Sequence, residues 1–331
     1  MRLSAIVVAF GKERLLADCL SRLERALARV EGETEVVVVV NELSADMTAS
    51  FQLRPGVVIV AGSPGLGFAG GVAAALAAAR GEWIALVNDD CLLEPEALGE
   101  MLLVGGRGAD VGSVAAQVRF AERPDVVNSA GLEIDFLGIA HERRLGDGAD
   151  AVESEAIDVF GASGTLALYR RAMLDEVGGF DPSFFAYLED ADLAWRARMA
   201  GWRCLFAPQA VAYHRHSSTL THGSSAKHLL VGRNRVRMLA KNASASLLRR
   251  RAPRMLVYDL LYVVYVGATS QTAAPLHGRL QGLAEWRTYR AAGRARRRPI
   301  ELPPSPGLRA ALDRNLVYRS LRHTSGLGDR G

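Results

Sequence analysis

The chain has 331 residues, of which 49% are hydrophobic and 23% are charged, and this composition excludes an intrinsically disordered protein. Its 3 cysteines lie far apart without C-x-x-C spacing, which argues against a zinc ribbon or a disulfide framework and for a reducing compartment. The apolar run Ala5–Phe10 is too short for a signal peptide. We therefore expect a large globular protein in the cytoplasm.

Charge is distributed unevenly along the chain. Residues 1–226 hold 19 Lys and Arg against 31 Asp and Glu, whereas residues 227–331 hold 21 against 5. This asymmetry predicts an acidic working domain over 1–226 and a basic, mainly helical region over 227–331. A basic surface attracts a polyanionic partner, which here is either an anionic membrane surface or a nucleic acid.

Short apolar runs alternate with amphipathic segments through the first part of the chain. The pattern predicts strands over Ala5–Phe10, Thr34–Val40, Val57–Ala61 and Trp83–Val87, and helices over Glu13–Arg29 and Gly70–Arg80. A strand–helix–strand rhythm is typical of an α/β fold, Rossmann-like, with a mostly parallel central sheet flanked by helices. In such sheets, ligands bind beyond the carboxyl ends of the strands.

Two later segments have distinctive compositions. Val159–Tyr169 is predicted to be one strand, and its small residues Gly161–Gly164 would let a ligand approach closely. Met255–Ala268 is apolar except for Asp259 and is too short and too interrupted to span a bilayer. It is predicted to be a core helix or a helix lying in a membrane interface.

Polar side chains follow two of the predicted strands. Asn41 and Glu42 follow the strand Thr34–Val40, and Asn88-Asp89-Asp90 follows the strand Trp83–Val87. Carboxylates at a strand end suit Mg²⁺ or Mn²⁺ held together with substrate phosphates. The alternative is a simple polar turn, which Asn and Asp also favour.

His214 follows a predicted strand over Cys204–Ala207 and is a candidate ligand for the same ion. His216 and His222 lie close by in sequence, but their spacing matches no standard zinc motif. The alternative is a structural or surface histidine.

Three carboxylates, Glu189, Asp190 and Asp192, open a predicted helix that stops at Gly201. A helix N-terminus favours negative charge, so a carboxylate there is expected to stay ionised at neutral pH. Aromatic residues precede the cluster, and an ionised carboxylate in an aromatic-walled site suits a general base. The alternative is that these acids only complement the helix dipole.

The segment Gly65–Gly70 matches the dinucleotide-binding pattern G-x-G-x-x-G, with Asp89 following 19 residues later. That pattern normally occupies the first strand–helix turn of its domain, whereas here it follows the third strand. We therefore do not expect a nicotinamide or flavin cofactor.

Together these segments resemble the inverting family 2 glycosyltransferases of GT-A fold, particularly their bacterial rhamnosyltransferase-like branch. The resemblance runs from about Ser4 to about Asn242. It is carried by AIVVAF, VVVVVN-x-x-S-x-D, PGLGFAGG, GEWIALVNDD-x-x-x-x-P, FGASGTLALYRR, GGFDPSFFAYLEDADLAWRARMAGW and AYH. It implies transfer of a sugar from a nucleoside-diphosphate donor to a hydroxyl of a cell-envelope glycan or a polyprenyl-linked acceptor. Rhamnose is the first candidate for this sugar.

The resemblance also implies a role for each matching residue. Asp190 would deprotonate the acceptor hydroxyl, with Glu189 and Asp192 shaping the acceptor site. Asp90 and His214 would bind Mg²⁺ or Mn²⁺. The positions that match the family's nucleotide contacts are Phe10, Asn41, Gly67 and Asp89.

Some positions depart from the family pattern. Val40 stands where the family usually has an aspartate that recognises the base, so that task would pass to Asn41 or Glu42. Gly11, Gly65 and Ala73 stand where asparagine is common. The resemblance therefore does not specify the donor's base and sugar.

Two other functions stay open. A nucleotidyltransferase would also use paired aspartates, a metal ion and a nucleotide. A non-catalytic nucleic-acid-binding protein could use the basic C-terminal third, but that third has no nucleic-acid-binding motif, so no nucleic acid is expected. Arg249–Arg251, Arg254 and Arg294–Arg298 are instead expected to dock on the anionic inner face of the cell membrane, unless they form a solvated basic tail.

Overall fold

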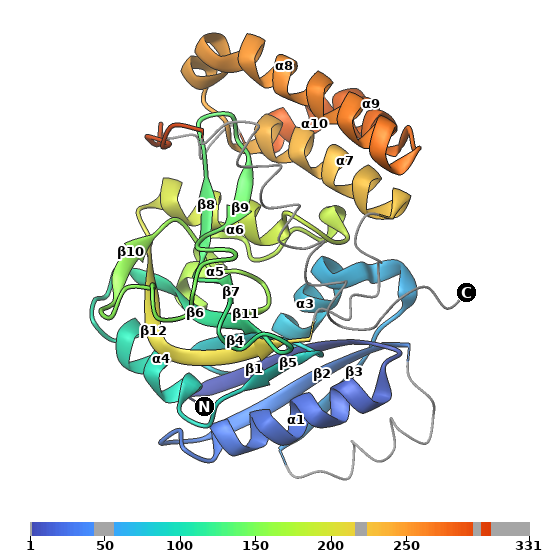
Figure 1. Ribbon diagram of the computed structural model, residues 1–331. Helices are drawn as coiled ribbons and strands as arrows, with labels where there is room; N and C mark the ends of the chain where they lie inside the picture. Colours follow the sequence, from blue (N-terminus) through green and yellow to red (C-terminus); the bar gives the residue numbers. More distant parts are fainter. Residues whose placement is uncertain (1, 43–55, 216–223, 294–298, 306–331) are drawn as a thin grey trace.

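The computed structural model describes residues 2–42, 56–215, 224–293 and 299–305. Its centre is a 10-stranded mixed sheet in the order β10-β12-β6-β11-β4-β1-β2-β3, with β5 beside β12 and β7 beside β6 (Figure 1). These strands are β1 (Leu3–Phe10), β2 (Thr34–Glu42), β3 (Val57–Ala61), β4 (Trp83–Asn88), β5 (Cys91–Leu93), β6 (Val111–Phe120), β7 (Val127–Ser129), β10 (Ile157–Val159), β11 (Leu166–Arg170) and β12 (Arg203–His214). A separate hairpin pairs β8 (Leu132–Ile134) with β9 (Ala140–Glu142).

The first strands are parallel, and all of them except the half-buried edge strand β3 are buried on both faces. β1 pairs in parallel with β2 and with β4, and β2 pairs in parallel with β3. β6 and β12 run in the same direction as these four, while β11 between β4 and β6 runs against them. This confirms the predicted, mostly parallel sheet. Its valine-rich strands are continuous apolar runs because helices cover both faces.

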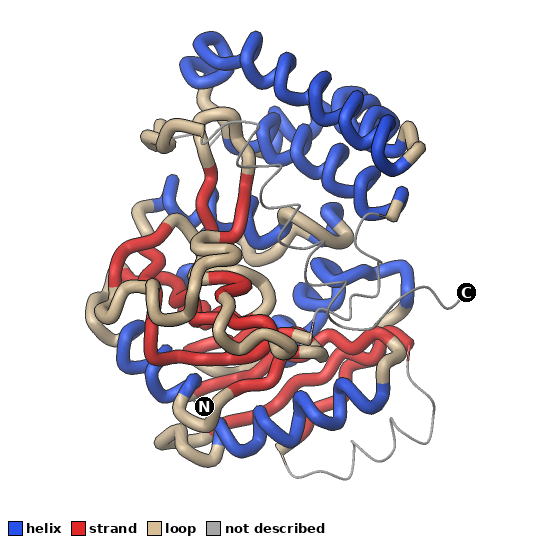
Figure 2. The backbone as a smooth tube through the Cα atoms, in the orientation of Figure 1, coloured by secondary structure: helices blue, strands red, loops and turns tan. Residues whose placement is uncertain are grey.

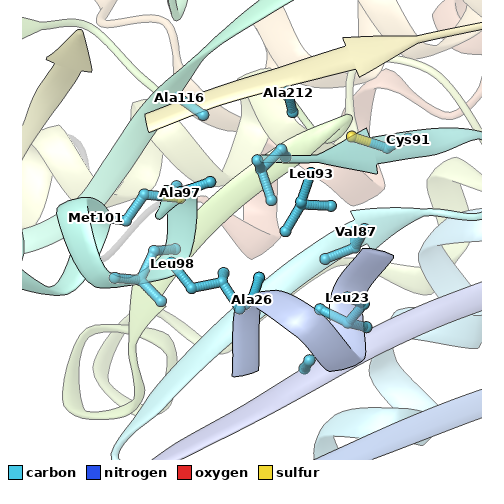
Figure 3. Packing of buried hydrophobic residues seen from close by; sticks show 14 of the residues in the cluster. Leu23, Ala26, Val87, Cys91, Leu93, Ala97, Leu98, Met101, Ala116 and Ala212 are labelled. Carbon is cyan, nitrogen blue, oxygen red and sulfur yellow. The ribbon is translucent and has the colours of Figure 1, made fainter. Parts of the chain in front are cut away.

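Helices cover the two faces of the sheet (Figure 2). On one face lie α1 (Glu13–Leu27) and α4 (Ala97–Gly105), and Figure 3 shows their apolar side chains beside Leu93 of β5. On the other face lie α3 (Gly67–Ala78), α5 (Arg171–Val177) and α6 (Glu189–Ala200). Two short 3-10 turns, η1 (Pro64–Leu66) and η2 (Pro182–Phe184), precede α3 and α6.

The prediction of one strand over Val159–Tyr169 is wrong. The structure has β10 and β11 there, and they pair with different partners, β12 and β4. The small residues between them are used for close packing: a Cβ added at Gly161 would lie 2.4 Å from the Cβ of Ala194 in α6. The Gly–Ala–Ser–Gly segment therefore interrupts the strand so that α6 can approach the sheet.

Four helices follow the sheet: α7 (Ser225–Asn242), α8 (Ala245–Ser270), α9 (Ala274–Ala284) and α10 (Trp286–Ala292). They form the predicted helical C-terminal extension, and α8 contains the apolar segment Met255–Ala268. Among the described helices, none is both long and apolar enough to cross a membrane. Arg294–Arg298 lie outside the described residues.

The extension shares a hydrophobic core with the rest of the chain. Trp195 and Met199 of α6 belong to the same buried cluster as Met238 and Leu239 of α7 and Met255 of α8. The domain boundary predicted after residue 226 stays a prediction, but α7, which begins there, is packed directly on α6.

Candidate active site

Sheet pairing brings His214 to the carboxylate pair that follows β4. β5 pairs antiparallel with the end of β12, and in this register His214 lies opposite Cys91, next to Asp90. The His214 Nε2 lies 3.0 Å from Asp90 Oδ1, and both side chains are almost fully buried. The His214 Nδ1 lies 3.0 Å from the Asn128 amide oxygen, so we assign the Nδ1–H as donor to Asn128. Nε2 then faces Asp90, as an N–H donor in the protonated ring or as a lone pair that a cation would bind.

Asp90 and His214 fit a divalent cation. A carboxylate oxygen and an imidazole nitrogen are both accepted by Mn²⁺, and Asn128 holds the ring as outer-shell partners of metal-binding histidines do. Burial alone would lower the pKa of His214, but the charge of Asp90 outweighs it and the pKa is raised. Within the described ranges no group of three or more His, Cys, Asp or Glu is arranged to hold a metal ion. Asp90 and His214 would therefore be a partial ligand set that substrate phosphates complete.

Asp89 points to the end of β1 rather than to His214. Its Oδ2 accepts a hydrogen bond of 3.1 Å from the backbone N–H of Phe10. Burial raises the pKa of Asp89 to about 6, despite this hydrogen bond. The structure therefore brings together two of the four residues expected to contact a nucleotide, Phe10 and Asp89.

Asn41, at the end of β2, is buried with both polar atoms of its amide unpaired among the described residues. A Cβ added at Gly62 would lie 2.2 Å from Asn41 Oδ1, so the glycine is needed to make room for this amide. An unsatisfied buried polar group costs about 1–3 kcal/mol each. A ligand that supplies a donor and an acceptor would remove this cost, which suits the expected base contact.

Gly67 begins α3 with a left-handed φ of +62°. A Cβ there would lie 2.5 Å from the backbone oxygen of Phe185, and the same oxygen accepts a 2.9 Å hydrogen bond from the N–H of Ala69. The glycine-rich turn therefore packs against the aromatic segment that precedes α6. This contact explains the glycine, and the expected contact of Gly67 with a nucleotide stays a prediction.

Asp190, at the start of α6, is oriented by two backbone N–H groups. Its Oδ2 accepts a 3.0 Å hydrogen bond from the N–H of Gly164, and its Oδ1 accepts one of 2.7 Å from the N–H of Ala191. The preceding residue, Glu189, is buried, and its Oε2 has no hydrogen-bond partner among the described residues. Two adjacent carboxylates thus have very different surroundings.

The pKa values of the pair depart from the expectation of ionised carboxylates. Burial, followed by the charge of Asp190, raises the pKa of Glu189 to about 8, so Glu189 is mainly protonated at pH 7. Burial also raises the pKa of Asp190, but the N–H groups of Gly164 and Ala191 oppose that shift. Within the pair, Asp190 is therefore the residue whose ionised form is favoured.

Asp192 does not line the site. Its side chain is fully buried, and it accepts hydrogen bonds from Arg196, Lys241 and Asn242 at 2.8, 2.9 and 2.8 Å. Burial opposes ionisation, but the charges of Arg196 and Lys241 lower the pKa of Asp192. It can shape the acceptor site only indirectly, by joining α6 to α7.

The segment before α6 has an unusual backbone that α7 holds in place. Phe185, Tyr187 and Leu188 have positive φ angles of 66°, 70° and 67°, which non-glycine residues rarely adopt. The buried Asn234 of α7 has its Nδ2 2.8, 2.9 and 2.8 Å from the backbone oxygens of Phe184, Ala186 and Tyr187, which share its two hydrogens. Such strain persists only where neighbouring structure enforces it, and it gathers at functional sites.

A cavity of about 350 Å³ opens at Asp190, between the β8–β9 hairpin, α6 and the C-terminal helices. Glu142 of β9 lines it beside Glu189 and Asp190, and its Oε1 accepts a 3.0 Å hydrogen bond from Ser163. Burial and the charge of Asp190 raise the pKa of Glu142 to about 7. The C-terminal residues that line the cavity with charged or aromatic side chains are Lys227, Arg235, Tyr258, Tyr262 and Arg279.

Glu142, Asn128 and this group of C-terminal residues were not predicted from the sequence. Glu142 lies on a strand of only 3 residues, which is too short for a periodic pattern. Asp259, which interrupts the apolar segment of α8, was the one available signal, because a charge within a buried run needs a partner. In the structure, its partners are Arg235 and Arg279.

Comparison with known proteins identifies the family. A family model described as "Glycosyltransferase like family 2" matches residues 2–229, and the chain therefore belongs to that family of sugar-transferring enzymes. Over 67 residues, the chain is 42% identical to the N-acetylglucosaminyl-diphospho-decaprenol L-rhamnosyltransferase of Mycobacterium tuberculosis. That match spans 20% of this chain and 22% of the relative.

Solved structures confirm the GT-A fold. A mannosyltransferase from Pyrobaculum calidifontis, solved with GDP-Man and Mn²⁺, superposes with a TM-score of 0.51 at 17% identity, covering 97% of this chain and 80% of that one. GalNAc-T7, solved with UDP, GalNAc and Mn²⁺, has a TM-score of 0.59 at 12% identity over 87% of this chain and 57% of that one. At such identities the likeness establishes the fold alone.

Proposed function

We propose that the chain is an inverting glycosyltransferase that moves a sugar from a nucleoside-diphosphate donor to a hydroxyl of a cell-envelope glycan or lipid-linked acceptor. The observation that carries the proposal is the position of Asp190, which lines the cavity with a carboxylate oriented by Gly164 and Ala191. Rhamnose is the proposed sugar, because the matched part of the Mycobacterium tuberculosis relative is 42% identical.

Asp90 and His214 are the proposed ligands of Mg²⁺ or Mn²⁺, and both relatives of known structure named above were solved with Mn²⁺. When bound there, the ion would act as a Lewis acid that neutralises charge on the departing diphosphate. Asn128 keeps the His214 ring in place through its contact with Nδ1. Phe10, Asn41 and Asp89 are the proposed contacts of the nucleotide, and the unpaired Asn41 amide supports a base contact.

Asp190 acts as the general base in this proposal. As the acceptor oxygen attacks the anomeric carbon, its proton passes to the Asp190 carboxylate and the bond from that carbon to the diphosphate breaks. Attack in line with the departing group inverts the anomeric centre. Burial raises the pKa of Glu189, so the neutral form of Glu189 is favoured beside Asp190, and the ionised Asp190 can accept the proton.

The test is the identity of the products. Purified protein is screened by thermal shift against nucleotide sugars with Mn²⁺, because a bound donor raises the melting temperature according to its occupancy. The stabilising donor is then incubated with candidate acceptors. We expect consumption of the sugar nucleotide with release of a nucleoside diphosphate. Release of pyrophosphate from a nucleoside triphosphate and a sugar phosphate, with no nucleoside diphosphate released from the sugar nucleotide, would instead identify a nucleotidyltransferase and overturn the proposal.

We further propose that the protein docks on an anionic membrane through α8 and α9, which lie side by side (Figure 1). Among the described residues, the large hydrophobic side chains that are exposed lie on these helices, except for Leu103. This apolar face consists of Leu256, Val257, Leu260, Leu261, Val264, Leu276, Leu280 and Leu283. Arg249, Arg250 and Arg254 are exposed at the start of α8, where each contributes about 1 kcal/mol near an anionic surface.

A further inference from the structure

The cavity that contains Asp190 also contains three cationic side chains. Lys227 and Arg235 of α7 and Arg279 of α9 line it. The two guanidinium groups share one carboxylate, since Arg235 Nε and Arg279 Nη2 lie 2.9 and 2.7 Å from the same oxygen of Asp259. Two positive charges against one negative charge leave this group with a net positive charge, to which Lys227 adds another.

The arginines are held rigidly and keep hydrogen-bonding capacity. Arg235 also donates to the backbone oxygens of Leu137 and Gly138, and Arg279 donates to that of Pro275. Both side chains are more than nine-tenths buried. Each guanidinium has five N–H groups, and these bonds together with those to Asp259 do not use all of them. A planar donor group fixed in this way suits a phosphate.

Two tyrosines complete the same wall of the cavity. Tyr258 and Tyr262 are stacked with ring centroids 6.3 Å apart, and Arg235 and Arg279 lie over them at 5.4 and 5.0 Å. The Tyr262 hydroxyl lies 3.2 Å from His228 Nδ1. With the His228 Nδ1–H as donor in this bond, the Tyr262 hydroxyl keeps its own proton for an anion.

We propose that Lys227, Arg235, Arg279 and the two tyrosines form a subsite for a phosphate or diphosphate group carried by the acceptor. The inference rests on the proposed function, because it needs an acceptor hydroxyl at Asp190 in the same cavity. The donor's diphosphate is assigned to the proposed metal site at Asp90 and His214. The cationic group of Lys227, Arg235 and Arg279 would therefore bind a different phosphate. The subsite therefore favours a diphosphate-linked acceptor over a neutral glycan.

The first test does not require sugar transfer. Inorganic pyrophosphate is titrated calorimetrically into the full chain in EDTA, which prevents metal-dependent binding at Asp90 and His214. We expect saturable binding that weakens about ten- to a hundredfold in Lys227→Met, as expected for loss of a charge-assisted hydrogen bond. Arg107→Met, which removes an exposed charge elsewhere, is the control. Absence of binding to the wild type, or equal binding to Lys227→Met, overturns the subsite.

The second test compares acceptors with the same sugar linked to a methyl group, a methyl diphosphate or a farnesyl diphosphate. We expect kcat/KM for both diphosphates to exceed that of the methyl glycoside by at least about tenfold, and Lys227→Met and Tyr262→Phe to reduce this advantage. A higher kcat/KM for the farnesyl diphosphate than for the methyl diphosphate would identify a lipid-linked acceptor. Equal values for the two diphosphates would identify a soluble sugar diphosphate as the acceptor. Equal use of all three acceptors overturns the inference. If none is glycosylated, the proposed function fails, while pyrophosphate binding still decides the subsite.

Discussion

Two neighbouring carboxylates at the start of α6 show how strongly the surroundings of a residue set its chemistry. Asp190 and Glu189 share one helix N-terminus, but Asp190 has backbone donors at both oxygens, whereas Glu189 has a buried oxygen without a described partner. The donors favour the ionised form of Asp190, and burial favours the neutral form of Glu189. This division gives the proposed base a neutral neighbour in place of a second negative charge.

Replacing Asp190 by asparagine tests the proposed base directly. General-base help contributes about 10²–10⁴-fold, so Asp190→Asn should raise the barrier by about 3–5 kcal/mol. The measurement is kcat for nucleoside-diphosphate release, with donor affinity from calorimetry as a second readout. We expect kcat to fall while donor affinity changes little. Asp175→Asn, an exposed acid on α5, is the control, and near-normal turnover of Asp190→Asn would refute the role.

The buried Glu189 should leave a signature in the pH dependence of stability. Its pKa is about 8 in the folded protein against 4.5 for the ordinary group, so the folded state binds the proton more tightly. Its contribution is therefore complete below pH 4.5 and is lost as the pH rises through about 8. Glu189→Gln should flatten the fall in melting temperature between pH 5 and pH 8, measured without metal. Equal slopes for the variant and the wild type would contradict the assignment.

At the scale of elements, α7 determines the shape of the segment that presents Asp190. The three backbone oxygens bound by Asn234 lie next to residues with positive φ, so their conformation depends on a side chain from a distant helix. Gly67 contributes from the other side by admitting Phe185. The segment that precedes α6 is therefore held between α3 and α7.

Asn234→Ala should release this segment. The backbone oxygens of Ala186 and Tyr187 lose a donor, while that of Phe184 keeps Arg233, so the protein should be destabilised by about 2–4 kcal/mol. Because the released segment carries Asp190, kcat should also fall. Urea denaturation and the transferase assay measure the two effects. Thr288→Ala, an exposed change on α10, is the control, and an Asn234→Ala variant as stable and active as this control would show that α7 does not hold the loop.

At the scale of the whole molecule, the basic C-terminal region serves two different surfaces. Arg235, Arg237 and Arg279 are buried and paired with Asp259 or Glu285, so their charge stabilises the fold and the cavity. The exposed arginines at the start of α8 instead adjoin the apolar face of α8 and α9. The cavity and the apolar face share helix α8, which would place the opening for the acceptor close to a membrane surface.

Membrane docking can be tested by cosedimentation with vesicles of phosphatidylglycerol and phosphatidylcholine. We expect pelleting that weakens with added salt and falls several-fold in Leu260→Asp, which puts an anion into the apolar face. Leu103→Asp introduces the same change at the exposed leucine outside that face and should pellet like the wild type. Failure of the wild type to pellet at low salt would remove the docking proposal. If Leu260→Asp instead abolished a dimer seen by light scattering, a second copy of the chain would be the partner.

Local pattern in the sequence determined the strands β1–β4 and the helix that begins at Glu189. It also determined two acidic motifs, Asn88-Asp89-Asp90 at the end of β4 and the carboxylates that open that helix. These features depend on residue type and spacing within a short window, which is why Val57–Ala61 was predicted with the bounds that β3 has. The tertiary structure alone decided which polar residues meet. The pairing of β5 with β12 brings His214 to Asp90, and the packing of α7 on α6 takes Asp192 into a buried ion-pair network while Asp190 remains in the cavity. Such meetings depend on sheet order and helix packing between distant segments, and no local spacing encodes them.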